Sequence, residues 1–210
     1  MQIQLSNIGK RFNREWIFRS VDYCFNSGKK YAIVGHNGSG KSTLLQIISG
    51  AVTHSEGNIS FSRVSNATAI NPENTYQEIA FCAPYLELLE EMTAMELLNF
   101  HCAFKKFTAS HFDILDKVGL IQAKDKQIRY FSSGMKQRLK LALAFFSDTP
   151  VLLLDEPTSN LDEQGITLYL NLIEKQTEGK TVIICSNDKT EYHFCEHILS
   201  IEDYKKSMVK

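Results

Sequence analysis

A glycine-rich stretch near the N-terminus has the residue types and the spacing of a phosphate-binding loop. Residues 35–43 read GHNGSGKST and match the pattern G-x-x-x-x-G-K-[ST] in full. Because glycine carries no Cβ, such a loop can bend tightly and bring its backbone amides close to an anion. A helix that begins at the loop adds the positive end of its dipole. The residues expected to contact phosphate are Gly35, Asn37, Gly38, Ser39, Gly40, Lys41, Ser42 and Thr43.

Two side chains of this loop have distinct chemical roles. Lys41 supplies a positive charge to the outer phosphates of a nucleotide, and Ser42 supplies a hydroxyl ligand for Mg²⁺. The alternative is a glycine-rich turn before a helix that binds no ligand. The register of Lys41 and Ser42 directly after Gly40 disfavours that alternative.

A pair of carboxylates follows an apolar run further along the chain. Residues 151–154 read VLLL, and Asp155 and Glu156 come directly after them. A buried parallel strand that ends in this way places its carboxylates at the carboxyl edge of the sheet, where α/β folds bind ligands. Asp155 is expected to hold the Mg²⁺ shell, and Glu156 is placed to polarise an attacking water. Solvated acids at a strand end are the alternative, which the phosphate-binding loop disfavours.

The elements that must position these groups alternate between strand and helix. Strand-like apolar runs lie at residues 31–35, 151–154 and 181–185, and helical spacing of apolar residues occurs at 41–49 and 161–176. This order predicts an α/β fold with a mostly parallel sheet that is covered on both faces.

Two further segments complete the predicted organisation. Residues 2–8 alternate in polarity and predict an edge strand, whereas residues 92–146 read as helix. We therefore expect one domain over residues 1–210, with a helical lobe inserted into the α/β core. The predicted boundaries place the core at about 1–83 and 149–210, and the lobe at about 84–148.

Composition restricts the class of protein. The 210 residues are 43% hydrophobic and 22% charged, and a net charge of −1 does not favour a nucleic-acid binder. No apolar run approaches the roughly 18–20 residues of a membrane-spanning helix, and the N-terminus does not resemble a signal peptide. The five cysteines form no C-x-x-C pair, which favours free thiols in a reducing cytosol.

Two further motifs carry a family resemblance. Residues 131–138 read FSSGMKQR and resemble the ABC signature motif, usually written LSGGQ, while residues 159–162 read SNLD and resemble the D-loop of that family. Together with the phosphate-binding loop and the acidic strand end, these motifs occur in ABC order over almost the whole chain. The resemblance implies a P-loop NTPase core with an N-terminal antiparallel β part and an inserted helical subdomain.

The resemblance also implies a nucleotide site that two subunits share. Two ABC domains pack head to tail, and the signature helix of one faces the phosphate-binding loop of the other. Ser132, Ser133 and Gly134 would then contact the γ-phosphate of ATP, and Asp162 would lie at the dimer seam. Adenine is expected to stack on Phe12; a core position for Phe12, or Trp16 in its place, is the alternative.

This chain departs from the family pattern at two loops. Pro84 or Tyr85 stands where the family places a Gln, so Mg²⁺ would be held by Ser42, Asp155 and water, with Glu87 as a less favoured substitute. Asn187 stands where the family places a switch histidine. An amide can hydrogen-bond a γ-phosphate oxygen, but it carries no charge near neutral pH. Because Glu156 and Lys41 are intact, hydrolysis is still expected, at a lower rate.

The resulting functional hypothesis is an ATP-hydrolysing subunit that binds ATP and Mg²⁺ and powers a membrane transporter. The departures and the FSSGM signature resemble small ABC subunits of bacterial haem and multidrug exporters, so export is expected. The partners would be a separate integral membrane subunit and a second ABC subunit, identical or paralogous, on the cytoplasmic face of the cell membrane. The alternatives are a soluble ABC ATPase that acts on nucleic acid or ribosomes, and a nucleotide-binding regulatory module without turnover.

Overall fold

The centre of the protein is a parallel sheet whose strands are mostly apolar. The computed structural model describes residues 1–63, 68–70 and 74–205. Its five strands are all parallel and lie in the order β6 (Ile79–Cys82), β7 (Val151–Asp155), β8 (Thr181–Cys185), β3 (Lys30–Val34) and β9 (His197–Ser200). Every residue of β7 and β8 is buried, as expected for strands covered on both faces.

Alternate residues of these strands serve two separate hydrophobic cores. Leu152 and Leu154 of β7 pack into one cluster, whereas Val151 and Leu153 pack into the other. This division follows from the two-residue period of a strand. The helices of the core are α1 (Lys41–Ile48), α2 (Thr75–Glu78), α6 (Glu163–Gln176) and α7 (Lys189–Tyr192), followed by the 3₁₀ turn η4 (Ile201–Tyr204). Helix α5 (Ser133–Phe146) also packs against β6. The predicted α/β fold is confirmed, and the predicted strands and helices of the core agree with these bounds to within two residues.

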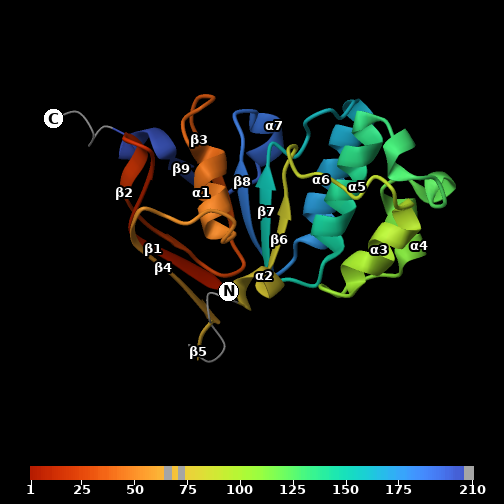
Figure 1. The fold of residues 1–210 in the computed structure, drawn as a ribbon, viewed down its shortest axis with the longest axis horizontal. Coiled ribbons are helices and arrows are strands. Elements are labelled where there is room, and N and C mark those ends of the chain that lie inside the picture. Colours follow the sequence, from red (N-terminus) through yellow and green to blue (C-terminus); the bar gives the residue numbers. More distant parts are fainter. Residues whose placement is uncertain (64–67, 71–73, 206–210) are drawn as a thin grey trace.

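A second, antiparallel sheet lies beside α1 at one end of the molecule (Figure 1). Its order is β2 (Glu15–Phe25), β1 (Gln2–Phe12), β4 (Glu56–Arg63) and β5 (Thr68–Ala69). The prediction of an edge strand at residues 2–8 is wrong, because β1 pairs with β2 on one side and with β4 on the other. Its alternation instead reflects one buried face, since Ile3, Leu5 and Ile8 are fully buried.

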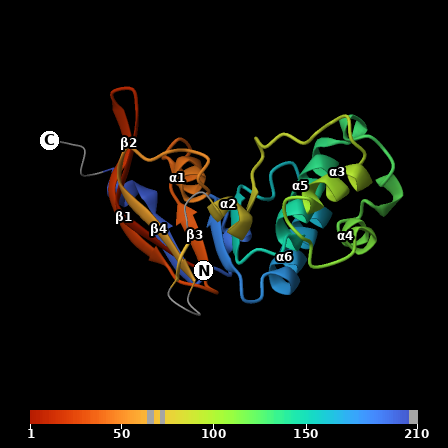
Figure 2. The same ribbon diagram turned by 60° about the horizontal axis from the view of Figure 1, so that its bottom comes forward.

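A helical region occupies the opposite end of the molecule in both views (Figures 1 and 2). It lies between β6 and β7 in the chain and contains α3 (Ala94–Cys102), α4 (His111–Lys117), η2 (Ile121–Ala123), η3 (Ile128–Tyr130) and α5 (Ser133–Phe146). Thr93 and Glu96 form a reciprocal capping box that fixes the start of α3. The domain boundaries at residues 84 and 148 remain a prediction. Over the described ranges, no helix has the length and apolar character needed to cross a membrane.

Candidate functional site

The phosphate-binding loop joins β3 to α1 and needs glycine for both backbone and steric reasons. Gly40 has φ of +105°, and a Cβ at this position would lie 2.6 Å from Cγ2 of Ile17. Only glycine combines this conformation with so close an approach. The loop borders a cavity of about 250 Å³ that is lined by Ile17, Asn37, Gly38, Ser39, Gly40, Lys41, Ser42, Thr43 and Glu156.

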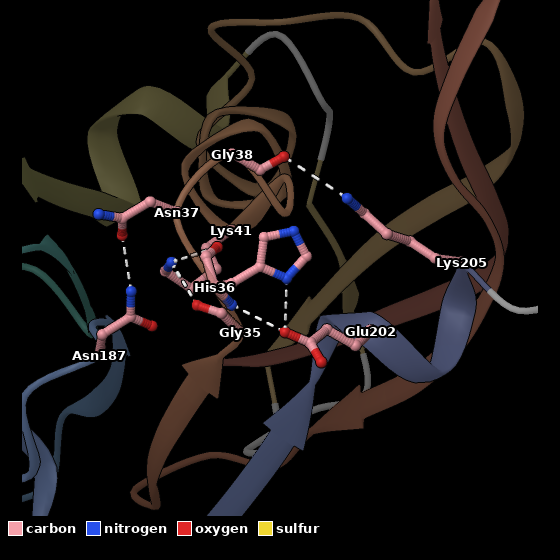
Figure 3. Close-up of polar contacts among 8 residues, drawn as sticks. All are labelled: Gly35, His36, Asn37, Gly38, Lys41, Asn187, Glu202 and Lys205. Carbon is pink, nitrogen blue, oxygen red and sulfur yellow. Dashed lines mark hydrogen bonds and ion pairs between the residues drawn. The ribbon is translucent and has the colours of Figure 1, made fainter.

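Polar groups of this loop are arranged for an anion. The Lys41 ammonium donates to the backbone carbonyls of Gly35 at 2.7 Å and His36 at 3.2 Å, so it lies over the loop (Figure 3). The hydroxyl of Ser39 is buried and has no hydrogen-bond partner among the described residues. A buried polar group without a partner calls for a ligand or water. The loop therefore fits a phosphate group.

Asp155 lies at the carboxyl end of β7 and is 1% exposed. Within the described ranges neither carboxylate oxygen has a hydrogen-bond partner, although the Ser42 and Tyr85 hydroxyls lie near enough to affect its pKa. Burial raises the pKa of this carboxyl, and the hydroxyls of Ser42 and Tyr85 and the charge of Lys41 oppose the increase. A buried carboxylate next to a hydroxyl is a donor set that suits Mg²⁺.

Glu156 follows Asp155 in a backbone conformation that is rare for its residue type. Its φ is +41°, in the left-handed region. Its side chain is exposed and lines the same cavity as Lys41 and Ser42. It also lines a second cavity of about 260 Å³ with Asn37 and Asn187. The acidic residue and the phosphate-binding loop therefore share one space, as their sequence positions suggested.

The switch position contacts the loop directly. The amide nitrogen of Asn187 donates to the side-chain oxygen of Asn37 at 2.7 Å (Figure 3). Asn187 follows β8, and β8 lies next to β3 in the sheet, so strand order brings the two loops together.

The C-terminal turn also contacts the loop, and the sequence did not reveal this. A carboxylate oxygen of Glu202 accepts the backbone N–H of His36 at 2.8 Å, and the His36 ring Nδ1 lies 2.8 Å from the same oxygen (Figure 3). Lys205 donates to the carbonyl of Gly38 at 3.5 Å. No local pattern signals contacts between residues that lie 166 positions apart.

The signature residues do not reach the phosphate-binding loop of their own chain. Ser132 caps α5 by accepting the N–H of Met135 at 3.2 Å, and Ser133 and Gly134 begin that helix. Asp162 caps α6 by accepting the N–H of Gly165 at 2.8 Å. None of Ser132, Ser133, Gly134 and Asp162 lines the cavity at the loop.

The predicted adenine contact lies at the end of β1. Phe12 is 50% exposed, and the Lys10 ammonium lies 4.6 Å from its ring centroid. Trp16, the alternative, stacks against the guanidinium of Arg19 at 4.2 Å. Neither ring lines the cavity at the loop, whereas Ile17 does. Sequence reasoning missed Ile17, because an apolar residue in a strand has no distinguishing signal.

The loop after β6 places Tyr85 near Asp155. Burial and the charge of Asp155 raise the pKa of the Tyr85 phenol. The side chain of Lys140 anchors the loop by donating to the Pro84 carbonyl at 2.5 Å. Glu87 does not line the cavity at the phosphate-binding loop; it lines a separate cavity of about 710 Å³ that includes Lys140.

Comparisons with known proteins identify the family and the fold of this chain. The sequence pattern of the family described as "ABC transporter" matches residues 18–159. An uncharacterised ABC transporter ATP-binding protein, YybJ of Bacillus subtilis, is 33% identical, with 98% of this chain and 92% of YybJ covered. The lantibiotic transport ATP-binding protein SrtF of Streptococcus pyogenes is 30% identical over 90% of this chain and 81% of SrtF. The ATP-binding cassette MJ0796, solved as a dimer with ADP and Pi, superposes with a TM-score of 0.82 at 24% identity, covering 94% and 93% of the two chains.

Proposed function

This chain belongs to the ABC transporter family as an ATP-binding ATPase subunit, and from that premise we propose that it drives export by a membrane transporter. Relatives whose names describe lantibiotic transport and linearmycin resistance support export as the direction. The observation that carries the proposal is that Glu156, Lys41 and Ser42 line one cavity at the carboxyl edge of the parallel sheet.

We assign roles in that cavity by the chemistry of each group. Lys41 and the loop amides bind the β- and γ-phosphates of ATP. Ser42 and Asp155 would hold Mg²⁺, which would neutralise phosphate charge, and the carboxylate of Asp155, unpartnered among the described residues, supports this assignment. Glu156 orients and polarises the attacking water. Asn187 gives up its bond to Asn37 and donates to a γ-phosphate oxygen instead.

The site is completed by a second ABC subunit. Ser132, Ser133 and Gly134 lie at the N-terminus of α5, where backbone amides and the helix dipole favour an anion. Because these residues do not line the loop cavity of their own chain, they are available to the γ-phosphate bound by a partner. Asp162 would lie at the seam, and Phe12 would stack on adenine through its exposed ring face.

The transport pathway belongs to a separate integral membrane subunit, and this chain would act at the cytoplasmic face of the membrane. An apolar cavity of about 240 Å³ between the loop after β6 and the helical region offers a docking place. Phe81, Leu86, Leu88 and Leu143 contribute its apolar surface. An amphipathic helix of the membrane subunit would place its apolar face there.

The test compares ATP hydrolysis by the wild type, Glu156→Gln and a control, Glu174→Gln, which makes the same change at an exposed position on α6. General-base catalysis contributes about 100-fold or more, so Glu156→Gln should lose at least that factor in kcat while still binding ATP. Size-exclusion chromatography in Mg-ATP should show a trapped dimer of this variant.

Equal turnover by the wild type and Glu156→Gln would overturn the role of Glu156. ATP binding without turnover in the wild type, in the presence of its membrane subunit, would instead identify a regulatory module.

A further inference from the structure

The two residues after Glu156 are held by two buried polar side chains that the proposed function does not use. Gln137 on α5 is 2% exposed, and Glu191 on α7 is 3% exposed. The amide nitrogen of Gln137 donates to the Pro157 carbonyl at 2.8 Å. A carboxylate oxygen of Glu191 accepts the backbone N–H of Thr158 at 2.7 Å and also the hydroxyl of Thr158.

These hydrogen bonds hold the peptide group between Pro157 and Thr158 from two sides. Pro157 has no N–H, so its carbonyl is its only backbone hydrogen-bonding group, and Gln137 satisfies it. The next N–H in the chain, that of Thr158, goes to Glu191. The carbonyl and the N–H belong to the same peptide group, so its plane is fixed by a donor from one helix and an acceptor from another.

The residue just before this peptide unit needs such support. Glu156 has a left-handed backbone, which a non-glycine residue keeps only when its surroundings enforce it. On its N-terminal side, the N–H of Glu156 donates to the carbonyl of Cys185 at 2.9 Å, so that side is fixed by the sheet. On its C-terminal side, the sheet has ended; the Glu156 carbonyl accepts the N–H of Ser159 at 3.1 Å, and the buried side chains of Gln137 and Glu191 hold the peptide group between Pro157 and Thr158.

Each of the two helices that carry these side chains is tied to another part of the fold. The hydroxyl of Tyr169 on α6 donates to the backbone carbonyl of Glu191 at 2.6 Å. Gln137 lies one helical turn after the signature residues Ser132–Gly134 and on the same helix. Any rotation of α5 against the sheet would therefore move the amide that holds Pro157.

We propose that Gln137 and Glu191 are positioning residues that act as a clamp on the Pro157–Thr158 peptide and thereby aim Glu156 at the nucleotide. The clamp rests on the proposed function of Glu156. It ties the signature helix, which contacts the partner's nucleotide, to the carboxylate that serves this chain's own nucleotide.

The experiment uses the full chain with isosteric apolar replacements, Gln137→Met and Glu191→Met, and the conservative Glu191→Gln, which keeps an acceptor oxygen for Thr158. Lys189→Met is the control, because it makes a similar replacement at an exposed position on α7. Misplacement of a reacting group by about 1 Å costs up to about 100-fold in rate. Each Met variant should lose about tenfold or more in kcat with little change in KM for ATP, and Glu191→Gln should stay within about threefold of wild type.

Amide hydrogen exchange supplies a readout that does not need turnover. Glu191→Met removes the acceptor of the Thr158 N–H, so exchange over residues 156–162 should accelerate. Gln137→Met removes no amide acceptor, yet it should also accelerate exchange at Thr158 because the clamp acts as a unit. For the same reason, the double variant should lose little more kcat than the worse single variant.

Wild-type exchange at residues 156–162 in both Met variants would overturn the clamp, as would wild-type kcat in both. If the Met variants fail to fold, Gln137→Asn replaces them, because its amide is one methylene too short to reach the Pro157 carbonyl. Faster exchange at residues 156–162 in Gln137→Asn than in Lys189→Met supports the clamp, and identical exchange overturns it. The proposed function fails separately, when Glu156→Gln hydrolyses ATP like the wild type, and the exchange result still decides the clamp.

Discussion

At the scale of single residues, the site holds polar groups that the fold leaves unsatisfied. The buried oxygens of Asp155 and Ser39 have no hydrogen-bond partner among the described residues, and Glu156 adopts a strained backbone. Such features cost stability and persist where a ligand or a reaction needs them. No other buried side-chain nitrogen or oxygen of the described residues lacks a partner, and Gln137 and Glu191 are examples of paired groups.

His101 gives a prediction about pH at this scale. Its ring Nε2 lies 2.9 Å from the Ser147 hydroxyl, and burial, with a smaller effect of Lys105, lowers its pKa to about 4. The unfolded value is about 6.5, so between these pH values the unfolded chain binds more protons. Stability contributed by neutral His101 is therefore complete above about pH 6.5 and is lost as the pH falls toward 4.

The measurement is the melting temperature at pH 7.5 and pH 5. We expect the decrease on acidification to be smaller in His101→Gln, which keeps a polar side chain that does not titrate. His193→Gln, at an exposed position, serves as the control and should keep the wild-type decrease. The prediction is wrong if both variants lose the same number of degrees as the wild type.

At the scale of elements, the strand–loop–helix unit from β3 to α1 owes its shape to contacts outside itself. Ile17 of β2 lies so close to Gly40 that no side chain fits there. The side chain of Asn187, after β8, donates a hydrogen bond to Asn37. The carboxylate of Glu202 in η4 accepts the backbone N–H of His36. The phosphate-binding loop is thus supported from three directions by segments distant in the sequence. Its conformation depends on the packing of both sheets.

The replacement Gly40→Ala tests this dependence. The added Cβ would meet Ile17, and the positive φ adds strain of about 1–3 kcal/mol. Displacement of the loop amides should weaken ATP binding about tenfold or more, which titration with a fluorescent ATP analogue would measure. Gly179→Ala is matched, since its φ is +73° and nothing lies within 4 Å of the added Cβ. Gly179→Ala should lose stability but keep its affinity for ATP. Equal ATP affinities of Gly40→Ala and Gly179→Ala would contradict the prediction.

The sequence predicts the site residues that belong to contiguous motifs, but not those that tertiary packing brings to the site from distant segments. The loop at residues 35–43 and the acids at 155–156 are contiguous motifs, and the structure places both at one cavity. The alternation of residues 2–8 does not predict the two neighbours of β1, because alternation reveals one buried face but not how many neighbours a strand has. Ile17, Glu202 and Glu191 reach the site only through tertiary packing, so no spacing rule identifies them.

At the scale of the whole molecule, the two proposed parts of the nucleotide site lie on different parts of the fold. The phosphate-binding loop joins β3 to α1, whereas the signature residues begin α5 on the helical side (Figure 1). The signature residues do not line the cavity at the loop of their own chain, and in the proposed site a partner chain supplies them. A symmetric pair supplies both parts twice, in keeping with the closed symmetry of most oligomers.

Ser132→Asp separates dimerisation from ATP binding. Aspartate is as good an N-cap as serine, so α5 should still begin at residue 133, but its charge would repel the partner's γ-phosphate. In the Glu156→Gln background, we expect the ATP-dependent dimer to disappear from size-exclusion chromatography while the affinity for ATP is retained. Ser110→Asp, which alters the corresponding N-cap of α4, is the control. A dimer that persists in Ser132→Asp would refute the shared site.

The position of β3 in the sheet also determines the order in which a newly made chain can fold. Residues 30–34 leave the ribosome early, yet their two neighbours are β8 at 181–185 and β9 at 197–200. Strand β3, which leads into the phosphate-binding loop, therefore has both edges unpaired until most of the chain has been synthesised. Unpaired apolar strands invite aggregation, and pairings of such long sequence separation form slowly. Nascent chains of this protein should depend on chaperones until residues near 200 emerge.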